Sequence, residues 1–394
     1  MSLNSTVTAE RIHIGFFGKR NAGKSSLINE ITNQEVSLVS EIKGTTTDPV
    51  KKSMEILPLG PVTLIDTPGF DDEGTLGLMR VRKSEEMLSI CDIAIFVTES
   101  DFLDKDELEV VQSIKEKNIP LLIVHNKADL LNELPKNKEN EFYVSAKNHI
   151  GIEELKRAIS VSYKGREKEI CFVADFINEG DIVILVTPID SSAPKGRMIL
   201  PEQQAIRDII DHHAISIVTQ PEELNYLLKS LPKAPKLVVT DSQAFGKVMK
   251  IVPTSIPLTS FSILMARYKG FLDTAVKGAM AIDSLEANSK VLISEGCTHH
   301  RQCEDIGTVK LPLWLKKYTN LELDFEFTSG HGFPKDLSKY DLIIHCGGCM
   351  LNDNEIKNRM NEAIKANVPF TNYGTAIAYI NGILNRSIEP IYNK

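Results

Sequence analysis

The sequence predicts an α/β protein of three domains, and three observations lead to this prediction. The chain has 394 residues, which is too long for one ordinary hydrophobic core. Strand-like apolar runs alternate with helical segments in three successive stretches, a pattern typical of parallel sheets with crossover helices. A charged segment at 162–169 interrupts this pattern and indicates a linker. We therefore expect domains at 1–165, 170–265 and 266–394.

The composition is that of an ordinary globular protein, with 42% hydrophobic and 25% charged residues. The formal net charge of -8 gives no general affinity for nucleic acid or for an anionic membrane. No apolar stretch approaches the length of a membrane span, and residues 1–10 lack the apolar core of a signal peptide. Six cysteines, four of them grouped towards the carboxyl end, fit a reducing cytosol and metal chemistry better than a disulfide scaffold. We expect a soluble, cytoplasmic protein that binds neither membranes nor nucleic acid.

A phosphate-binding motif opens the first domain. An apolar strand at 11–17 runs into G-x-x-x-x-G-K-S at 18–25, and a helix follows. In such a loop, glycines let successive backbone amides point at phosphate oxygens, Lys24 reaches the terminal phosphates, and the Ser25 hydroxyl binds Mg²⁺. The residues that we expect to hold the nucleotide here are Gly18, Asn21, Ala22, Gly23, Lys24, Ser25 and Ser26.

Three further motifs follow in order. Asp66 ends a strand and can reach Mg²⁺, while the amide of Gly69 can sense a γ-phosphate. Asp129, in the Asn-Lys-Ala-Asp motif at 126–129, can accept hydrogen bonds from guanine N1–H and N2–H, which adenine does not offer. The other residues expected to bind the base are Asn126, Lys127, Ser145, Ala146 and Lys147. After a phosphate loop, this set resembles the GTPases of the tRNA-modification and Era-like group over about residues 10–160.

The expected catalytic set is completed by the first switch. The segment 44–48 (Gly-Thr-Thr-Thr-Asp) lies where GTPases of this group have their first switch. Its Gly-x-Thr pattern points to Thr46 as the second Mg²⁺ ligand, with Thr45 and Thr47 as alternatives. Phe70 follows Gly69, where Ras-like enzymes have the glutamine that orients the attacking water. The residues that we expect to act in catalysis are Lys24, Thr46, Asp66 and Gly69.

Asn21 indicates how the missing glutamine is compensated. It resembles the asparagine that helps to hold K⁺ against the phosphates in potassium-activated relatives. The alternative is a turn residue that tolerates its backbone angles. We expect slow GTP hydrolysis that K⁺ stimulates.

The middle domain carries no chemical motif of its own. Strand-like runs at 182–186, 215–218 and 237–239 alternate with helical segments, without a second phosphate loop or a nucleophile elbow. Such a sheet usually serves as a scaffold or for self-association. Asp190, in a loop after the first strand, could approach a neighbouring site or could be a helix cap or a turn residue.

Two thiol-bearing loops mark the third domain. One apolar strand runs into 297–299 (Cys-Thr-His), and another runs into 345–349 (His-Cys-Gly-Gly-Cys). Ligands gather at the carboxyl ends of parallel strands, so both loops can face one site. Cys297, Cys346 and Cys349 suit either Zn²⁺ or a cubane iron-sulfur cluster with an exchangeable fourth position, and spacing alone does not separate the two. The remaining alternative is two unrelated pairs of buried cysteines.

Other residues near these loops are weaker candidates. His299, His300 and His345 are either hydrogen-bonding neighbours or ligands. Cys303 is either a spare thiol or a fourth ligand. The sequence assigns no role to Cys91 or Cys171.

The combination of these motifs resembles the family of FeFe-hydrogenase H-cluster maturation GTPases, the HydF family. The resemblance rests on the GTPase motifs, on the segment 187–197 and on the two thiol loops, and it spans essentially the whole chain. It implies a P-loop GTPase followed by two small parallel-sheet α/β domains, the last carrying an iron-sulfur cluster. The implied cluster is 4Fe-4S on Cys297, Cys346 and Cys349, and the candidates for its fourth ligand are His299, His345 and Asp190.

The resemblance also implies a function and partners. The protein would be a scaffold on which a two-iron precursor is assembled with two radical-SAM enzymes and then handed to apo FeFe-hydrogenase, with GTP/GDP, Mg²⁺ and K⁺ as cofactors of a regulatory GTPase. The middle domain suggests a homodimer or a higher oligomer. The alternative is an RNA- or ribosome-associated GTPase with a structural zinc domain, against which the acidic composition and the lack of a basic-aromatic surface argue.

Overall fold

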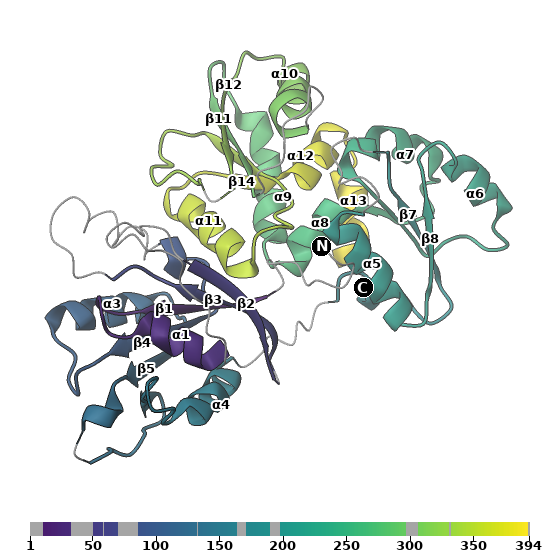
Figure 1. Ribbon diagram of the computed structural model, residues 1–394. Coiled ribbons are helices and arrows are strands. Elements are labelled where there is room, and N and C mark those ends of the chain that lie inside the picture. The colour runs from purple at the N-terminus through teal and green to yellow at the C-terminus, as the bar shows by residue number, and fades with distance from the viewer. Residues whose placement is uncertain are drawn as a thin grey trace. The chain divides into compact units, whose positions relative to one another are not determined.

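The computed structural model describes residues 11–32, 50–57, 59–69, 86–131, 133–163, 171–189, 198–296, 306–330 and 332–392. The chain divides into two compact units, which we call unit 1 (Met1–Arg166) and unit 2 (Glu167–Lys394), and Figure 1 draws both. The described residues form one sheet in unit 1 and two sheets in unit 2. The predicted fold class, a P-loop domain followed by two small parallel-sheet α/β domains, is confirmed.

Unit 1 contains a six-stranded sheet with the strand order β2-β3-β1-β4-β5-β6. Neighbouring strands pair in parallel except β2 and β3. The strands are β1 (Ile12–Phe17), β2 (Val50–Ile56), β3 (Gly60–Asp66), β4 (Ile93–Thr98), β5 (Leu121–His125) and β6 (Glu141–Tyr143). The central strand β4 is buried along its whole length, as expected for a sheet with both faces covered.

Helices and a short 3-10 turn, η2 (Ala128–Leu130), accompany this sheet. Helices α1 (Lys24–Thr32) and α4 (Ile152–Ser162) share one hydrophobic cluster with the sheet, and α3 (Lys105–Glu116) belongs to a second cluster on the other face. Helix α3 begins at Lys105, where Asp104 and Glu107 form a reciprocal capping box.

Unit 2 contains two parallel four-stranded sheets. The first has the order β10-β9-β7-β8 and the second the order β12-β11-β13-β14. The strands are β7 (Ile182–Val186), β8 (Ile215–Thr219), β9 (Leu237–Thr240), β10 (Leu258–Ser260), β11 (Lys290–Glu295), β12 (Asp324–Ser329), β13 (Leu342–His345) and β14 (Phe370–Asn372). The short strand β10 was not predicted from the sequence.

A single hydrophobic core runs through both sheets of unit 2. Figure 1 shows helices α8, α12 and α13 between the two sheets. Helix α12 is apolar and buried around most of its circumference, which suits this central place. The helices are α5 (Leu200–Asp211), α6 (Leu224–Ser230), α7 (Phe245–Ile251), α8 (Phe261–Tyr268), α9 (Leu272–Met280), α10 (Leu311–Thr319), α11 (Asp353–Lys365), α12 (Tyr373–Ile380) and α13 (Leu384–Tyr392). There are also short 3-10 helices, η3 (Ala174–Phe176), η4 (Ser242–Ala244) and η5 (Ala281–Ser284), and a π-helical turn, η6 (Ile306–Lys310).

The register of the second sheet of unit 2 places its strand ends together. Ser294 near the end of β11 pairs with Thr328 on one side and with His345 on the other. His345 in turn pairs with Asn372 at the end of β14. The chain therefore leaves β11 and β13 at the same end of the sheet, where the carboxyl ends of the parallel strands lie.

Among the described helices, none combines the length and apolarity that crossing a bilayer requires.

Candidate functional site

The phosphate loop of unit 1 depends on two glycines. Gly18 has a φ of +144° and Gly23 a φ of +88°, and a Cβ at either position would lie 2.1 Å from another atom, the Val97 carbonyl oxygen or Asn126 Nδ2. Only glycine therefore fits at both positions. The buried Lys24 Nζ donates hydrogen bonds to the carbonyl oxygens of Gly18 (2.9 Å) and Lys19 (2.7 Å). The lysine amine is thus held inside the loop that would cradle phosphates.

The side chains expected to bind Mg²⁺ meet at the end of β3. Ser25 Oγ donates a hydrogen bond of 2.5 Å to Asp66 Oδ2. Burial raises the pKa of the Asp66 carboxyl above its ordinary value, while the Ser25 hydrogen bond and the Lys24 charge lower it. A hydroxyl and a carboxylate in contact form the oxygen pair that a hard divalent cation prefers. Gly69 is the last described residue before 70–85.

Asn126 connects the phosphate loop with the base-binding motifs. Its Nδ2 donates to the Ala22 carbonyl oxygen (3.1 Å), and its Oδ1 accepts from the Ala146 amide (3.3 Å). Ser145 Oγ donates to Asp129 Oδ1 at 2.5 Å, which fixes the carboxylate that we expect to bind guanine. The motifs at 18–25, 126–129 and 145–147 are therefore brought together as the sequence predicts.

Four other residues expected to bind the nucleotide lie at the surface or in a surface ion pair. Asn21 is exposed and has a φ of 63°, so a left-handed turn by itself accounts for an asparagine there. Ser26 and Lys147 are exposed, and Lys127 Nζ pairs with Glu99. The switch residues 45–47, including Thr46, lie outside the described residues.

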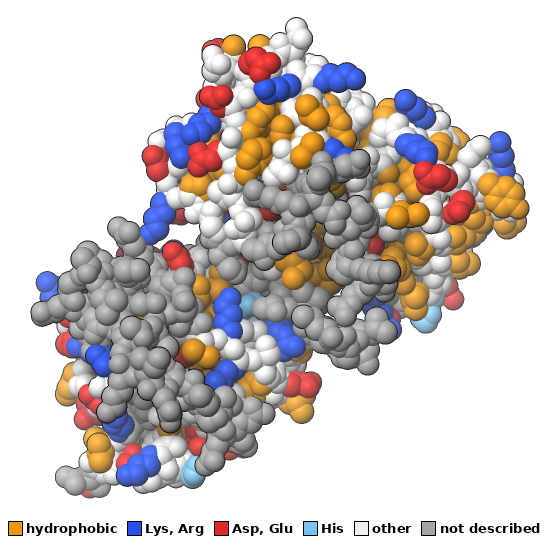
Figure 2. Space-filling view, turned by 45° about the horizontal axis from the view of Figure 1, so that its top comes forward, with side chains coloured by type: hydrophobic (Ala, Val, Ile, Leu, Met, Phe, Trp, Pro, Cys, Tyr) orange, Lys and Arg blue, Asp and Glu red, His pale blue; other side chains and the backbone are white. Residues whose placement is uncertain are grey.

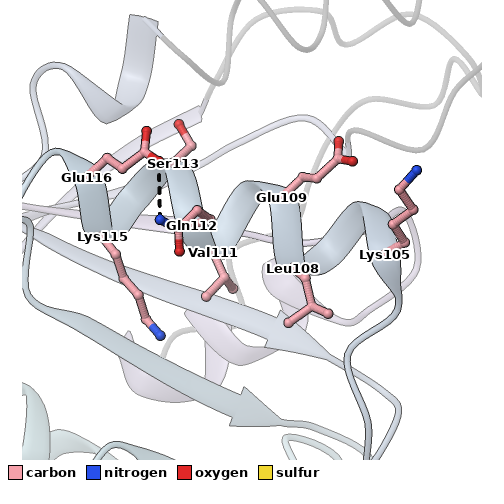
Figure 3. A pocket seen from close by; sticks show the side chains of 8 residues that line it. All are labelled: Lys105, Leu108, Glu109, Val111, Gln112, Ser113, Lys115 and Glu116. Atoms are coloured by element: carbon pink, nitrogen blue, oxygen red, sulfur yellow. Dashed lines mark hydrogen bonds between the residues drawn. The ribbon is translucent and has the colours of Figure 1, made fainter.

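A shallow hollow of about 520 Å³ lies along α3 in unit 1 (Figure 3). Its lining comes from α3 alone and includes Leu108, Val111 and several charged side chains. None of the residues of the nucleotide motifs lines it. We assign no function to this hollow.

The thiol loop after β13 in unit 2 is organised around the sulfur of Cys346. Cys346 Sγ accepts hydrogen bonds from the amides of Gly296 (3.0 Å) and Gly348 (3.4 Å). Gly296 directly precedes Cys297, so the starts of the two predicted thiol loops meet at this sulfur. Amide donors to sulfur are typical of thiolates that hold iron-sulfur clusters, and the donor set therefore fits such a group. Cys297 itself lies outside the described residues, as do His299, His300, Cys303 and Asp190.

Cys349 lies in the same loop beside a buried lysine. Burial and the neighbouring Cys346 raise the pKa of the Cys349 thiol to about 11, and the positive charge of Lys269 opposes this shift. Lys269 is only 4% exposed, and its Nζ donates to the carbonyl oxygens of Gly348 (2.9 Å) and Leu351. The buried ammonium group stabilises the conformation of the thiol loop through these two hydrogen bonds. Its positive charge would partly offset the negative charge of metal-bound thiolates.

His345 belongs to a buried polar network beneath the thiol loop. Its Nδ1 donates to the Cys346 carbonyl oxygen (2.9 Å), and its Nε2 accepts from Arg359 Nη1 (2.9 Å). Both ring nitrogens are therefore engaged, and this conformation offers neither of them to a metal. The candidate fourth ligand His345 fits this geometry poorly, because the ring serves to hold the backbone of Cys346.

Arg359 extends this network across the strand ends. Its Nη2 donates to Glu355 Oε1 and to the Gly330 carbonyl oxygen, each at 2.6 Å. Its side chain and that of Glu355 are 5% and 8% exposed. The guanidinium group thus ties the end of β12, the end of β13 and helix α11 to one another.

The sequence interpretation missed Lys269, Glu355 and Arg359. Glu355 and Arg359 are four residues apart and lie on the same helical stripe as Ile356 and Ala363. An oppositely charged pair on an apolar stripe is a signal for a buried ion pair and could have been detected. Lys269 gave no comparable signal, because its partners lie about 80 residues further along the chain.

Three family models match successive parts of the chain, and each part contains most or all strands of one of the three sheets that the described residues form. Residues 13–127 match the family model "50S ribosome-binding GTPase". Residues 172–270 match the hydrogen maturase F dimerization domain, and residues 273–390 match the hydrogen maturase F tetramerization domain. The chain therefore carries a GTPase domain, which binds and hydrolyses GTP, and two self-association domains.

Relatives with known names match the GTPase part. The tRNA modification GTPase MnmE of Francisella tularensis subsp. novicida is 35% identical over 174 residues, 42% of this chain and 38% of the relative. MnmE of Francisella philomiragia is 34% identical over 174 residues. The chain thus spans well under half the length of these relatives. The RNA-associated alternative is not favoured, because residues 172–390 match hydrogen maturase F domains instead.

Solved structures of GTP-binding proteins are similar to part of this chain. Era of Aquifex aeolicus is 18% identical with a TM-score of 0.34, and the match covers 56% of this chain and 98% of Era. The G domain of the FeoB iron transporter of T. maritima is 19% identical with a TM-score of 0.31, and the match covers 39% of this chain and 100% of that domain.

Taken with the GTPase model, the two family models that match unit 2 show that the chain belongs to the hydrogen maturase F family, whose members mature hydrogenases.

Proposed function

We propose that this protein is a GTP-hydrolysing scaffold and carrier for the two-iron precursor of the FeFe-hydrogenase active site. The observation that carries the proposal is the hydrogen bond from the Gly296 amide to Cys346 Sγ. It brings the chain directly before Cys297 to the loop that holds Cys346 and Cys349. Cys346 and Cys349 follow a parallel strand, and Cys297 is the next residue in the sequence after Gly296. In a chain with a GTPase domain and two hydrogen maturase F domains, these cysteines support a carrier of metal clusters.

In this proposal, Cys297, Cys346 and Cys349 hold a 4Fe-4S cluster. When bound, such a cluster supplies an iron site whose fourth ligand can exchange. The amides of Gly296 and Gly348 donate to sulfur, and Lys269 supplies a buried positive charge. For the fourth position, His299 and Asp190 stay candidates, whereas His345 is occupied by the Cys346 carbonyl and by Arg359.

The GTPase site works through charge neutralisation and positioning. On nucleotide binding, Lys24 exchanges the carbonyl oxygens of Gly18 and Lys19 for terminal phosphate oxygens. Ser25, which is hydrogen-bonded to Asp66, and Thr46 would hold Mg²⁺. The Gly69 amide contacts the γ-phosphate. Because Phe70 follows Gly69 where Ras-like enzymes have glutamine, we propose slow hydrolysis, which K⁺ held by Asn21 stimulates.

The nucleotide acts on partner binding in this scheme. GTP orders switch segments in GTPases, and hydrolysis releases them. We place the effect of the nucleotide on docking of the two radical-SAM enzymes and of apo-hydrogenase, in the cytoplasm, and not on chemistry at iron. This requires that the GTP and GDP forms bind at least one partner with different affinities.

We place self-association at β8, an edge strand of the first sheet of unit 2 within the described part of the chain. At one edge of this sheet, α13 packs against β10. At the other edge, β8 exposes Ile215 (48%) and Val218 (47%). Figure 2 shows hydrophobic side chains over the end of unit 2 that carries β8 and α6. An exposed apolar edge strand is suited to pair with a second copy of the chain, and we propose a homodimer through β8.

Transfer to apo-hydrogenase tests the proposed function. The full-length protein is isolated anaerobically from cells that also express the two radical-SAM enzymes, mixed with apo FeFe-hydrogenase, and hydrogen evolution is measured. We expect activation by the wild type and none by Cys346→Ser or Cys349→Ser. Cys91→Ala, which removes a buried thiol of unit 1, serves as the matched control and should activate normally. Wild-type activation by Cys346→Ser would contradict the proposal.

A further inference from the structure

A second group of metal-binding side chains lies in the first sheet domain of unit 2, outside the thiol loops. Cys171, Asp208 and His212 each offer one ligand atom, and these atoms all lie within 4.8 Å of one another. Cys171 comes shortly before η3, Asp208 lies in the last turn of α5, and His212 caps that helix. None of the GTPase or thiol-loop motifs includes these residues.

The helix supplies two of the three donors from one face. Residues four apart on an α-helix are neighbours, and zinc-binding helices use histidines with this spacing. His212 Nδ1 lies 3.6 Å from Asp208 Oδ1. Donors on a tetrahedral Zn²⁺, each about 2.0–2.3 Å from the ion, are separated by about 3.3–3.8 Å. The separation of these two atoms is therefore that of two ligands of one ion.

Asp208 is fixed by one carboxylate oxygen and offers the other. Its Oδ2 accepts hydrogen bonds from the amides of Val173 (2.6 Å) and Ala174 (2.8 Å). Its Oδ1 accepts no hydrogen bond within the described part of the chain. His212 Nδ1 donates to the Asp208 carbonyl oxygen (2.8 Å), which keeps the ring beside the carboxylate. Binding through Nδ1 replaces this hydrogen bond, and the imidazole proton then resides on Nε2.

The charge and the chemical type of the three donors favour Zn²⁺, an ion of intermediate softness. A thiolate and a carboxylate together balance the charge of a dication, and the carboxyl end of α5 adds the negative end of a helix dipole. Sulfur and imidazole donors select Zn²⁺ over Mg²⁺ or Ca²⁺, which prefer oxygen.

We propose that Cys171, Asp208 and His212 bind one Zn²⁺ ion, with water as the fourth ligand. Cys171 is the first described residue of unit 2, which starts at Glu167. The ion would fasten the start of this unit to the end of α5. The site is independent of the thiol loops and of the GTPase motifs.

Cobalt binding tests the site, because a sulfur-to-cobalt charge-transfer band in the near ultraviolet reports a thiolate ligand. The full-length variant Cys297→Ser/Cys346→Ser/Cys349→Ser removes the thiols of the other site. We expect one Co²⁺ per chain with this band, displaced by one equivalent of Zn²⁺. Adding Cys171→Ser should abolish the band, and adding Asp208→Asn or His212→Gln should weaken Zn²⁺ binding by about tenfold or more.

His213→Asn is the matched control, because His213 is the adjacent exposed histidine and has a φ of 58° that asparagine tolerates. It should leave the band and the affinity unchanged. If the triple-serine variant does not fold, elemental analysis of the wild-type chain with reconstituted iron replaces it, and Cys171→Ser should lose one zinc per chain. A cobalt-thiolate band that persists in Cys171→Ser, or zinc content equal in both chains, would overturn the proposal.

Discussion

Arg359→Met removes the buried cation beneath the thiol loop, and we expect it to lower the free energy of unfolding of unit 2 by about 3–5 kcal/mol. The variant removes the guanidinium group that lies 2.6 Å from the carboxylate of Glu355, whose side chain is 8% exposed. Removing one member of a buried ion pair costs about this amount. His345 Nε2 and the Gly330 carbonyl also lose their donor.

The assay uses the single tryptophan of the chain, Trp314. It lies on α10 and packs against the core of unit 2, so its fluorescence follows the unfolding of this unit in urea. Lys365→Met on the same helix is the matched control. Its exposed pair with Glu362, at 3.0 Å, should contribute less than about 1 kcal/mol.

A double variant separates the ion pair from the hydrogen bonds. Glu355→Met/Arg359→Met removes both charges, and it should destabilise unit 2 less than Arg359→Met alone, because the carboxylate is removed together with the guanidinium group. Equal destabilisation by the single and the double variant would refute the reasoning. A loss below about 1 kcal/mol in Arg359→Met would refute it as well.

Three further predictions concern other parts of the chain. Asp129→Asn should weaken GTP binding by about 100-fold or more, because two charge-assisted hydrogen bonds to guanine are lost. Xanthosine triphosphate should then bind to the variant better than GTP does. Titration with both nucleotides checks this, and unchanged GTP affinity would exclude Asp129 from the base site. The nearby Tyr340 hydroxyl and the paired Lys290 and Lys339 lower the pKa of the Glu326 carboxyl from 4.5 to about 2, so the stability that Glu326 contributes is present above pH 4.5 and lost as the pH falls towards 2. Trp314 fluorescence should show the difference between wild type and Glu326→Gln shrinking in that range, and a constant difference would contradict this. Val218→Lys places a charge on the edge strand β8 and should shift the oligomer towards smaller species in light scattering, whereas an unchanged mass would exclude this edge as the interface.

The arrangement of the GTPase site within the described residues could be predicted from the sequence. Its residues belong to short motifs, and each motif follows a buried strand whose end position is fixed by the parallel sheet. The structure accordingly brings Ser25 to Asp66 and Asn126 to Ala22. The first switch, with Thr46, lies outside the described residues and its role stays a prediction.

The surroundings of the thiol loops could be predicted only in part. The sequence placed Cys346 and Cys349 at the end of a buried strand, and the strand β13 ends there. It did not reveal that Arg359 reaches His345 or that Lys269 reaches Gly348, because both contacts join residues that have no fixed spacing in the chain. Histidine beside a cysteine pair suggested a ligand, whereas the structure uses both of its nitrogens in hydrogen bonds.

The same limit applies to Cys171, which the sequence left without a role. Its partners Asp208 and His212 show the spacing of four residues that a helix brings together, but a lone aspartate and histidine at this spacing are common on solvated helices. Only the folded chain shows that Cys171 lies beside them.

Electron paramagnetic resonance with iron and sulfide analysis tests the proposed cluster most directly. The protein is reconstituted anaerobically and reduced, and wild type is compared with Cys297→Ala, Cys346→Ala and Cys349→Ala. We expect a reduced 4Fe-4S signal that all three substitutions abolish and that imidazole alters by entering the exchangeable position. Stoichiometric zinc without an iron signal would contradict the proposal and leave a GTPase with a structural metal domain.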